Sequence, residues 1–158
     1  MRVSVLVVGK PAQRLSAAIA DYEARAARYW PLQVVEVREE RAGRNADPER
    51  LRRAEGERLW QQVPTGAESV ALTREGHALS SPELSDWLGQ RALEAHAGVA
   101  FLIGGAFGLA DEIVRRCTRR LRLSTMTMTH EIARLVLAEQ LYRAGTIMRN
   151  EPYHKGGT

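Results

Sequence analysis

Short apolar segments alternate with segments of helical periodicity along this chain. Four of the short segments, at residues 2–8, 32–37, 69–72 and 99–103, are rich in β-branched or other apolar residues. This composition is typical of the buried strands of a parallel sheet. A fifth strand is expected at residues 121–124, and helices are expected at about 15–29, 48–62, 82–96, 109–116 and 129–148. This order predicts an α/β fold with a mostly parallel sheet and helices on both faces.

Local residue signals support these boundaries. Trp30 precedes Pro31, and the residue before a proline disfavours the helical conformation, so the first helix is expected to end there. Asp47 followed by Pro48 is typical of a helix cap and a first helical residue. The 158 residues show no internal repeat, low-complexity tract or glycine-serine linker, so we expect a single domain over residues 1–158.

Composition excludes several classes of protein. Cys117 is the only cysteine, which excludes a disulfide framework and favours an intracellular compartment. No apolar run approaches the roughly 20 residues that a membrane-spanning helix needs, and residues 3–8 are too few for a signal peptide. The four histidines lack ligand spacing. We therefore expect a cytoplasmic protein with no membrane partner and no metal site.

The basic surplus of the chain lies in its last third. Residues 1–110 hold 14 basic and 14 acidic residues, whereas residues 111–158 hold nine and five, which gives the net charge of +4. A local surplus of this kind is typical of a surface that binds a polyanion. Five arginines fall within eight positions, at Arg115, Arg116, Arg119, Arg120 and Arg122. A phosphate-contact surface and an ordinary solvated helix end both remain open for this cluster.

Two segments at predicted strand ends offer their backbone to a ligand. Ligands of open α/β sheets bind beyond the carboxyl ends of the strands, which here directs attention to the loops after residues 72, 103 and 123. Residues 104–108 (GGAFG) do not fit a dinucleotide fingerprint, because Ile103 stands where G-x-G-x-x-G requires glycine. Phosphate-loop and serine-hydrolase motifs are also absent from the sequence. The glycines and residues 123–128 (LSTMTM) together suit the binding of a flat ligand such as an adenosine group. The alternative interpretation is that these two segments are a tight turn and an ordinary strand exit without a ligand.

Four separated stretches resemble the RlmH family, small methyltransferases of the SPOUT (α/β-knot) superfamily that methylate N3 of a pseudouridine in large-subunit ribosomal RNA. The stretches are residues 101–108 (FLIGGAFG), 123–128 (LSTMTM) with His130, 139–144 (EQLYRA) and 152–155 (PYHK). The resemblance covers the whole chain. One departure is Thr129, which stands where the family usually has a proline before the histidine.

The resemblance implies a SPOUT fold with a C-terminal deep trefoil knot. It implies S-adenosyl-L-methionine as the methyl donor, with these donor-binding residues: Leu72, Gly104, Gly105, Leu123, Ser124, Thr125, Met126, Thr127 and Met128. Methionines commonly fill cores, so we expect Met126 and Met128 to contribute their backbone. The resemblance also implies a homodimer with each active site near the partner subunit. The apolar residues of the last helix agree with this, namely Ile132, Leu135, Val136, Leu141, Ile147 and Met148.

The polar tail supplies the candidates for catalysis. Methyl transfer to a ring nitrogen requires loss of the N–H proton, and an imidazole such as that of His154 can accept a proton near neutral pH. Tyr153 can stack on a base, and Arg143 can hold a phosphate. The implied partner is the ribosome or its large-subunit RNA. The alternatives are a non-catalytic, ribosome-associated RNA-binding protein of the same fold and a related transfer-RNA methyltransferase, which would need an additional RNA-binding domain.

Overall fold

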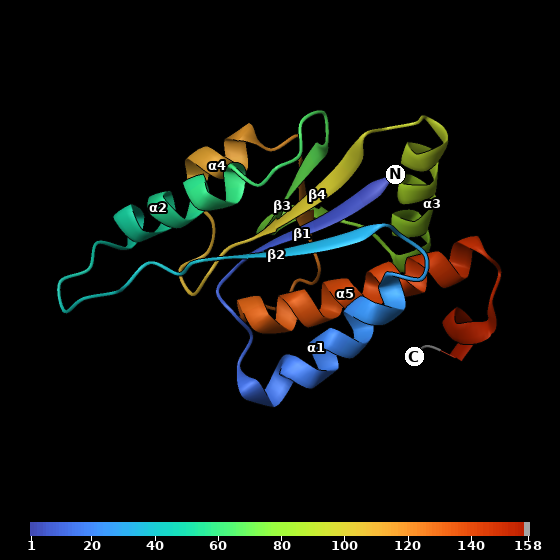
Figure 1. Cartoon of the computed structure of the whole chain (residues 1–158), viewed down its shortest axis with the longest axis horizontal. Coiled ribbons are helices and arrows are strands. Elements are labelled where there is room, and N and C mark those ends of the chain that lie inside the picture. The colour runs from blue at the N-terminus through green and yellow to red at the C-terminus, as the bar shows by residue number, and fades with distance from the viewer. Residues whose placement is uncertain (157–158) are drawn as a thin grey trace.

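The computed structural model describes residues 1–156, and its strands and helices alternate as predicted (Figure 1). The strands are β1 (Arg2–Val8), β2 (Leu32–Val37), β3 (Glu68–Ala78), β4 (Gly98–Ile103) and β5 (Arg119–Arg122). The helices are α1 (Gln13–Ala26), α2 (Pro48–Trp60), α3 (Ser81–Leu93), α4 (Asp111–Arg116) and α5 (His130–Met148), followed by a short 3₁₀ helix, η1 (Pro152–Gly156). Within residues 1–156, no helix combines the length and the apolar character that crossing a membrane requires.

The five strands form one parallel sheet in the order β2-β1-β4-β3-β5, which confirms the predicted architecture. Helices α1, α3 and α5 pack on one face and helices α2 and α4 on the other (Figure 1). All six residues of β4 are buried because both faces of this central strand are covered. The carboxyl ends of the five strands therefore lie along one edge of the sheet, where ligands of such folds bind.

Strand β3 is longer than predicted, and β5 begins and ends two residues earlier than predicted. Leu121 of β5 pairs first with Leu72 and then again with His77, where the register shifts. A side chain at Gly76 would place its Cβ 2.5 Å from the carbonyl carbon of Leu121, so glycine is required where β3 passes this backbone. The polar residues 73–76 lie between these two pairings, at the register shift of β3 against β5. The trefoil knot itself stays a prediction.

Helix α5 is bound closely by the two helices that flank it. The indole Nε1–H of Trp30 donates to the carbonyl oxygen of Leu141 at 2.9 Å, and the hydroxyl of Ser85 donates to that of Ala144 at 2.9 Å. A Cβ at Gly145 would lie 2.3 Å from Cγ of Tyr29, so the absence of a side chain there lets α5 approach the tyrosine ring. These contacts fix both the position of α5 and its rotation about its own axis.

A buried arginine joins three elements on the same face of the sheet. Arg134 of α5 is 6% exposed. Its Nε lies 2.7 Å from Oε1 of Glu23 in α1, and its Nη1 lies 3.0 Å from Oε2 of Glu36 in β2. Because a buried charge is costly unless it is paired, these two carboxylates are what allow Arg134 to be buried.

Replacing Arg134 by methionine is expected to lower the free energy of unfolding by about 3 kcal/mol, because Glu23 loses its partner in a site that is largely shielded from water. Urea denaturation measures this. The matched control is Arg53→Met, which removes an exposed ion pair with Glu49 and should change the free energy by no more than about 1 kcal/mol. Equal effects of the two substitutions would contradict a structural role for the buried pair.

Candidate functional site

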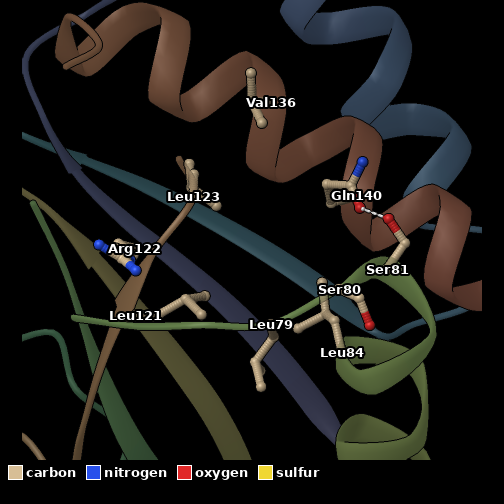
Figure 2. Close-up of a pocket in the computed structure, with 9 residues that line it drawn as sticks. All are labelled: Leu79, Ser80, Ser81, Leu84, Leu121, Arg122, Leu123, Val136 and Gln140. Atoms are coloured by element: carbon tan, nitrogen blue, oxygen red, sulfur yellow. Dashed lines mark hydrogen bonds between the residues drawn. The ribbon is translucent and has the colours of Figure 1, made fainter. Parts of the chain in front are cut away.

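A cavity of ≈ 220 Å³ lies beside the end of β5, between α3 and α5 (Figure 2). Its walls combine apolar side chains with polar groups from two serines, a glutamine and an arginine, and the lining residues are Leu79, Ser80, Ser81, Leu84, Leu121, Arg122, Leu123, Val136 and Gln140. Apolar side chains together with a few polar groups are found in sites for small organic ligands. Within residues 1–156, no group of three or more histidine, cysteine or acidic side chains is placed to hold a metal ion.

Of the nine predicted donor-binding residues, all within the part of the chain that the structure describes, only Leu123 lines this cavity. Leu72 lies within β3 and packs against the core in register with Leu121. The chain from Ser124 to Met128 then leads into α5, and the hydroxyl of Ser124 accepts the N–H of Met126 at 2.9 Å. The interpretation of Met126 as core filling was wrong, because its side chain is 79% exposed. The hydrogen bond of its N–H orders the turn in which it lies.

Gly104 and Gly105 lie buried at the end of β4, in a turn that we call the glycine loop (residues 104–108). The N–H of Gly108 donates to the carbonyl oxygen of Gly105 at 3.0 Å, and Gly108 has a φ of +79°. A Cβ at Gly104 would lie 2.4 Å from the carbonyl carbon of Gly108. The sequence argument explained these glycines by the approach of a ligand, whereas the structure shows that the turn itself already requires glycine at position 104.

The tail residues gather on the C-terminal half of α5. The hydroxyl of Tyr153 donates to Oε1 of Glu139 at 3.0 Å, and Nε of Arg143 donates to the same oxygen at 3.0 Å. The guanidinium of Arg143 also lies over the Tyr153 ring, 4.9 Å from its centroid. Burial raises the pKa of the Tyr153 hydroxyl, and its hydrogen bonds with Tyr22 and Glu139 raise it further, so Tyr153 stays a neutral donor.

His154 lies next to this cluster. It is half-buried, and among the described residues its Nδ1 is a buried atom that has no hydrogen-bond partner. A buried nitrogen without a partner is uncommon and suggests a site that is completed by another molecule. Two of the three predicted catalytic residues, Tyr153 and Arg143, are therefore brought together on one carboxylate, with His154 adjacent in sequence.

Sequence reasoning assigned no role to Glu139 or to the residues that connect it with the cavity. The hydroxyl of Ser81 donates to Oε1 of Gln140 at 2.5 Å, and Nε2 of Gln140 donates to Oε2 of Glu139 at 2.7 Å (Figure 2 shows the first bond). Since Ser81 and Gln140 line the cavity, hydrogen bonds run from its wall to Tyr153. The spacing of Glu139 and Arg143, four positions apart, was the available sequence signal.

Two parts of the predicted site, residues 124–128 and the tail, lie toward opposite ends of α5. Residues 123–128 precede the first turn of α5, whereas the tail packs near Arg143 and the far end of that helix (Figure 1). Thirteen residues separate His130 from Arg143, which corresponds to about 20 Å along a helix that rises 1.5 Å per residue. Residues 124–128 and the tail therefore lie toward different ends of the same helix, whereas Leu123 lines the cavity together with Gln140.

The arginine cluster is partly neutralised by acidic side chains. Arg116 pairs with Glu57 at 3.1 Å and with Glu112 at 2.7 Å. Arg119 pairs with Glu68 at 3.3 Å and lies over the ring of Trp87. Arg115 and Arg120 are exposed, so they are the members of the cluster whose placement best suits contact with phosphate.

Comparison with known proteins shows the family to which this chain belongs. Residues 1–154 match the family described as "Predicted SPOUT methyltransferase", and the chain belongs to this family. Two curated relatives carry the name Ribosomal RNA large subunit methyltransferase H. The relative from Gemmatimonas aurantiaca is 51% identical over 156 residues, which cover 98% of this chain and 100% of the relative. The one from Syntrophotalea carbinolica is 44% identical over 155 residues, covering 98% and 99%.

Solved structures give the same fold at low sequence identity. A probable methyltransferase from Bordetella pertussis Tohama I matches with a TM-score of 0.54 and 17% identity, over 90% of this chain and 95% of that one. A probable methylase family protein from Haemophilus influenzae Rd KW20 matches with a TM-score of 0.54 and 12% identity, over 96% of this chain and 69% of that one. At these identities the likeness concerns the fold alone.

Substituting Gly104 by alanine tests the glycine loop. The new Cβ would collide with the backbone of Gly108, so the loop must change shape while the rest of the sheet stays folded. We expect binding of S-adenosylmethionine to weaken by about tenfold or more, as measured by calorimetry. Gly43→Ala is the matched control, because a Cβ at Gly43 meets nothing within 4 Å. Equal donor affinity in the two variants would remove the glycine loop from the donor site.

Proposed function

We propose that this chain is an S-adenosylmethionine-dependent methyltransferase that acts on large-subunit ribosomal RNA, at N3 of a pseudouridine. The observation that carries the proposal is the similarity to relatives named as ribosomal RNA large subunit methyltransferases, which extends over 98% of the chain and includes both the donor segments and the tail. The specific nucleotide comes from the resemblance of residues 101–108, 123–128, 139–144 and 152–155 to the RlmH family. A ribosomal substrate places the enzyme in the cytoplasm.

The residues at the sheet edge fit a donor that has an adenosine group and an amino-acid group. S-adenosylmethionine supplies an electrophilic methyl group when bound. The cavity offers apolar side chains at Leu121 and Leu123 for a flat ring, and hydroxyl and amide groups at Ser81 and Gln140 for polar atoms. Holding two reactants in line can supply roughly 7–11 kcal/mol of the barrier, so orientation by these walls is the main contribution expected from the protein.

The tail performs the remaining tasks on the nucleotide. We infer that the half-buried imidazole of His154 accepts the N3 proton. Tyr153 presents an aromatic ring for stacking, and Arg143 beneath it holds the ring in place while it pairs with Glu139. Because the tail lies far along α5 from residues 123–128, we propose that the working enzyme is a homodimer in which the tail of one subunit meets the donor segments of the other.

Replacing His154 by alanine is expected to reduce the methyl-transfer rate about 10²–10⁴-fold, with little change in affinity for the ribosome, if the imidazole accepts the proton. The measurement is single-turnover transfer of labelled methyl from S-adenosylmethionine to whole ribosomes, separated subunits and free RNA. A rate equal to that of the wild type would exclude His154 as the acceptor. Absence of transfer by the wild-type protein to any of these substrates would favour the non-catalytic RNA-binding alternative.

Mixing two impaired variants tests the shared site, with S-adenosylmethionine held well below the Kd of the Gly104→Ala variant so that this variant has little activity. In a mixed dimer of Gly104→Ala and His154→Ala chains, one of the two sites would combine an intact glycine loop with an intact tail from the partner. We expect recovery of about a quarter of the wild-type rate after random exchange of subunits. Light scattering should give the mass of a dimer at micromolar concentration. A monomeric mass, or a mixture as inactive as its components, would contradict the proposal.

A further inference from the structure

A carboxylate is buried beneath the glycine loop, on the α2 face of the sheet. Glu55 is 4% exposed. Its Oε2 accepts the N–H of Glu40 at 3.1 Å, whereas its Oε1 is buried and, in the part of the chain that the structure describes, has no hydrogen-bond partner. A carboxylate in this position is satisfied at one oxygen only, although buried polar atoms in proteins are nearly always paired.

The glycine loop rests directly on this carboxylate. A Cβ at Gly105 would lie 3.2 Å from Oε1 and 3.3 Å from Oε2 of Glu55, and 3.1 Å from Cγ1 of Val8. Glu55 thus contacts the turn on one side and, through the N–H of Glu40, the chain between β2 and α2 on the other. The carboxylate lies near the carboxyl end of β4, because it contacts Gly105. In the sheet, β3 is adjacent to β4, and β5 is the next strand after β3.

The charged groups around Glu55 do not offset the cost of burying its negative charge. Burial raises the pKa of the Glu55 carboxyl, the N–H of Glu40 lowers it, and the neighbouring carboxylates of Glu39 and Glu40 raise it. Arg58 lowers it, but this guanidinium donates to Glu40 and to the carbonyl oxygen of Arg38. Lys10 and His130 are also near this edge, around the hollow beside Gly9. The ionised form therefore reduces the stability of the fold at neutral pH, and protonation relieves this cost.

We propose that Glu55 is a positioning residue for the methyl donor, whose free oxygen accepts a backbone N–H of the glycine loop when the donor is bound. This inference rests on the proposed function, since it requires that the loop contacts the donor. A side chain that costs stability in the free protein is expected where its charge serves binding. The carboxylate has the charge and the second acceptor that an amide or an apolar side chain of the same shape would lack.

Glu55→Gln separates this role from a structural one. The variant keeps the shape of the side chain but replaces one acceptor oxygen by a donor, and it carries no charge at any pH. We expect the variant to be at least as resistant to urea as the wild type. We also expect it to bind S-adenosylmethionine about 10- to 100-fold more weakly, which is the loss in affinity that corresponds to one hydrogen bond to a charged group. Glu57→Gln, on the same helix and paired with Arg116 at the surface, is the control and should bind as the wild type does.

The pH dependence gives a second readout that needs no variant to fold. Donor affinity of the wild type should fall as pH is lowered, because burial raises the pKa of the Glu55 carboxyl and its protonation removes the charge, and the Glu55→Gln profile should be flatter. Wild-type binding is measured first, so that its absence counts against the proposed function. Three outcomes would each overturn the role of Glu55. The first is a donor affinity that Glu55→Gln leaves unchanged, and the second is a donor affinity that falls only together with stability. The third is a wild-type donor affinity that does not change with pH.

Discussion

The docking of α5 between α1 and α3 is the constraint on which the other functional features depend. Trp30 and Ser85 donate to carbonyl oxygens on successive turns of α5, and Gly145 lets the helix sit against Tyr29. Once the rotation of α5 is fixed in this way, Gln140 faces the cavity while Glu139 and Arg143 face the tail. The helix therefore sets the position of residues 123–128 at its start and of the tail at its end.

Buried charges serve two different purposes in this molecule. Arg134 is compensated by two carboxylates from separate elements, and its network holds α1, β2 and α5 together. Glu55 is compensated at one oxygen only, and it lies beneath a loop rather than between packed elements. A complete network of this kind stabilises the fold, whereas an incomplete one is found where a protein tolerates a local cost for binding.

The sequence predicts the fold well because its strands and helices have different periodicities. Residues 3–8, apart from Ser4, and residues 99–103 are apolar and form the buried parts of β1 and β4, as expected for a parallel sheet. The exit of β3 was harder to predict, because residues 73–77 are polar and pair with β5 only through the bend at Gly76. Their structure depends on a strand that lies more than 40 positions away, which local patterns do not report.

The positions of the predicted site residues in the fold were only partly predictable from the sequence. Gly104 and Leu123 were identified from the strand exits, and the structure places Leu123 on the cavity. The roles of Glu139 and Gln140 depend on which side of α5 meets the tail, and the burial of Glu55 depends on how α2 packs under the glycine loop. Such facts arise from tertiary packing, for which a single sequence carries only weak signals such as the spacing of Glu139 and Arg143.

The double pairing of Leu121 with Leu72 and His77 has a consequence for the order in which the chain matures. Contacts between β3 and β5 join distant parts of the sequence, so a long loop must close before they form. Strand β5 and Leu123 are synthesised late, and both contribute walls of the cavity. A nascent chain that has not yet reached Leu123 therefore has no complete cavity, and the capacity to bind a donor arises only when most of the polypeptide has left the ribosome.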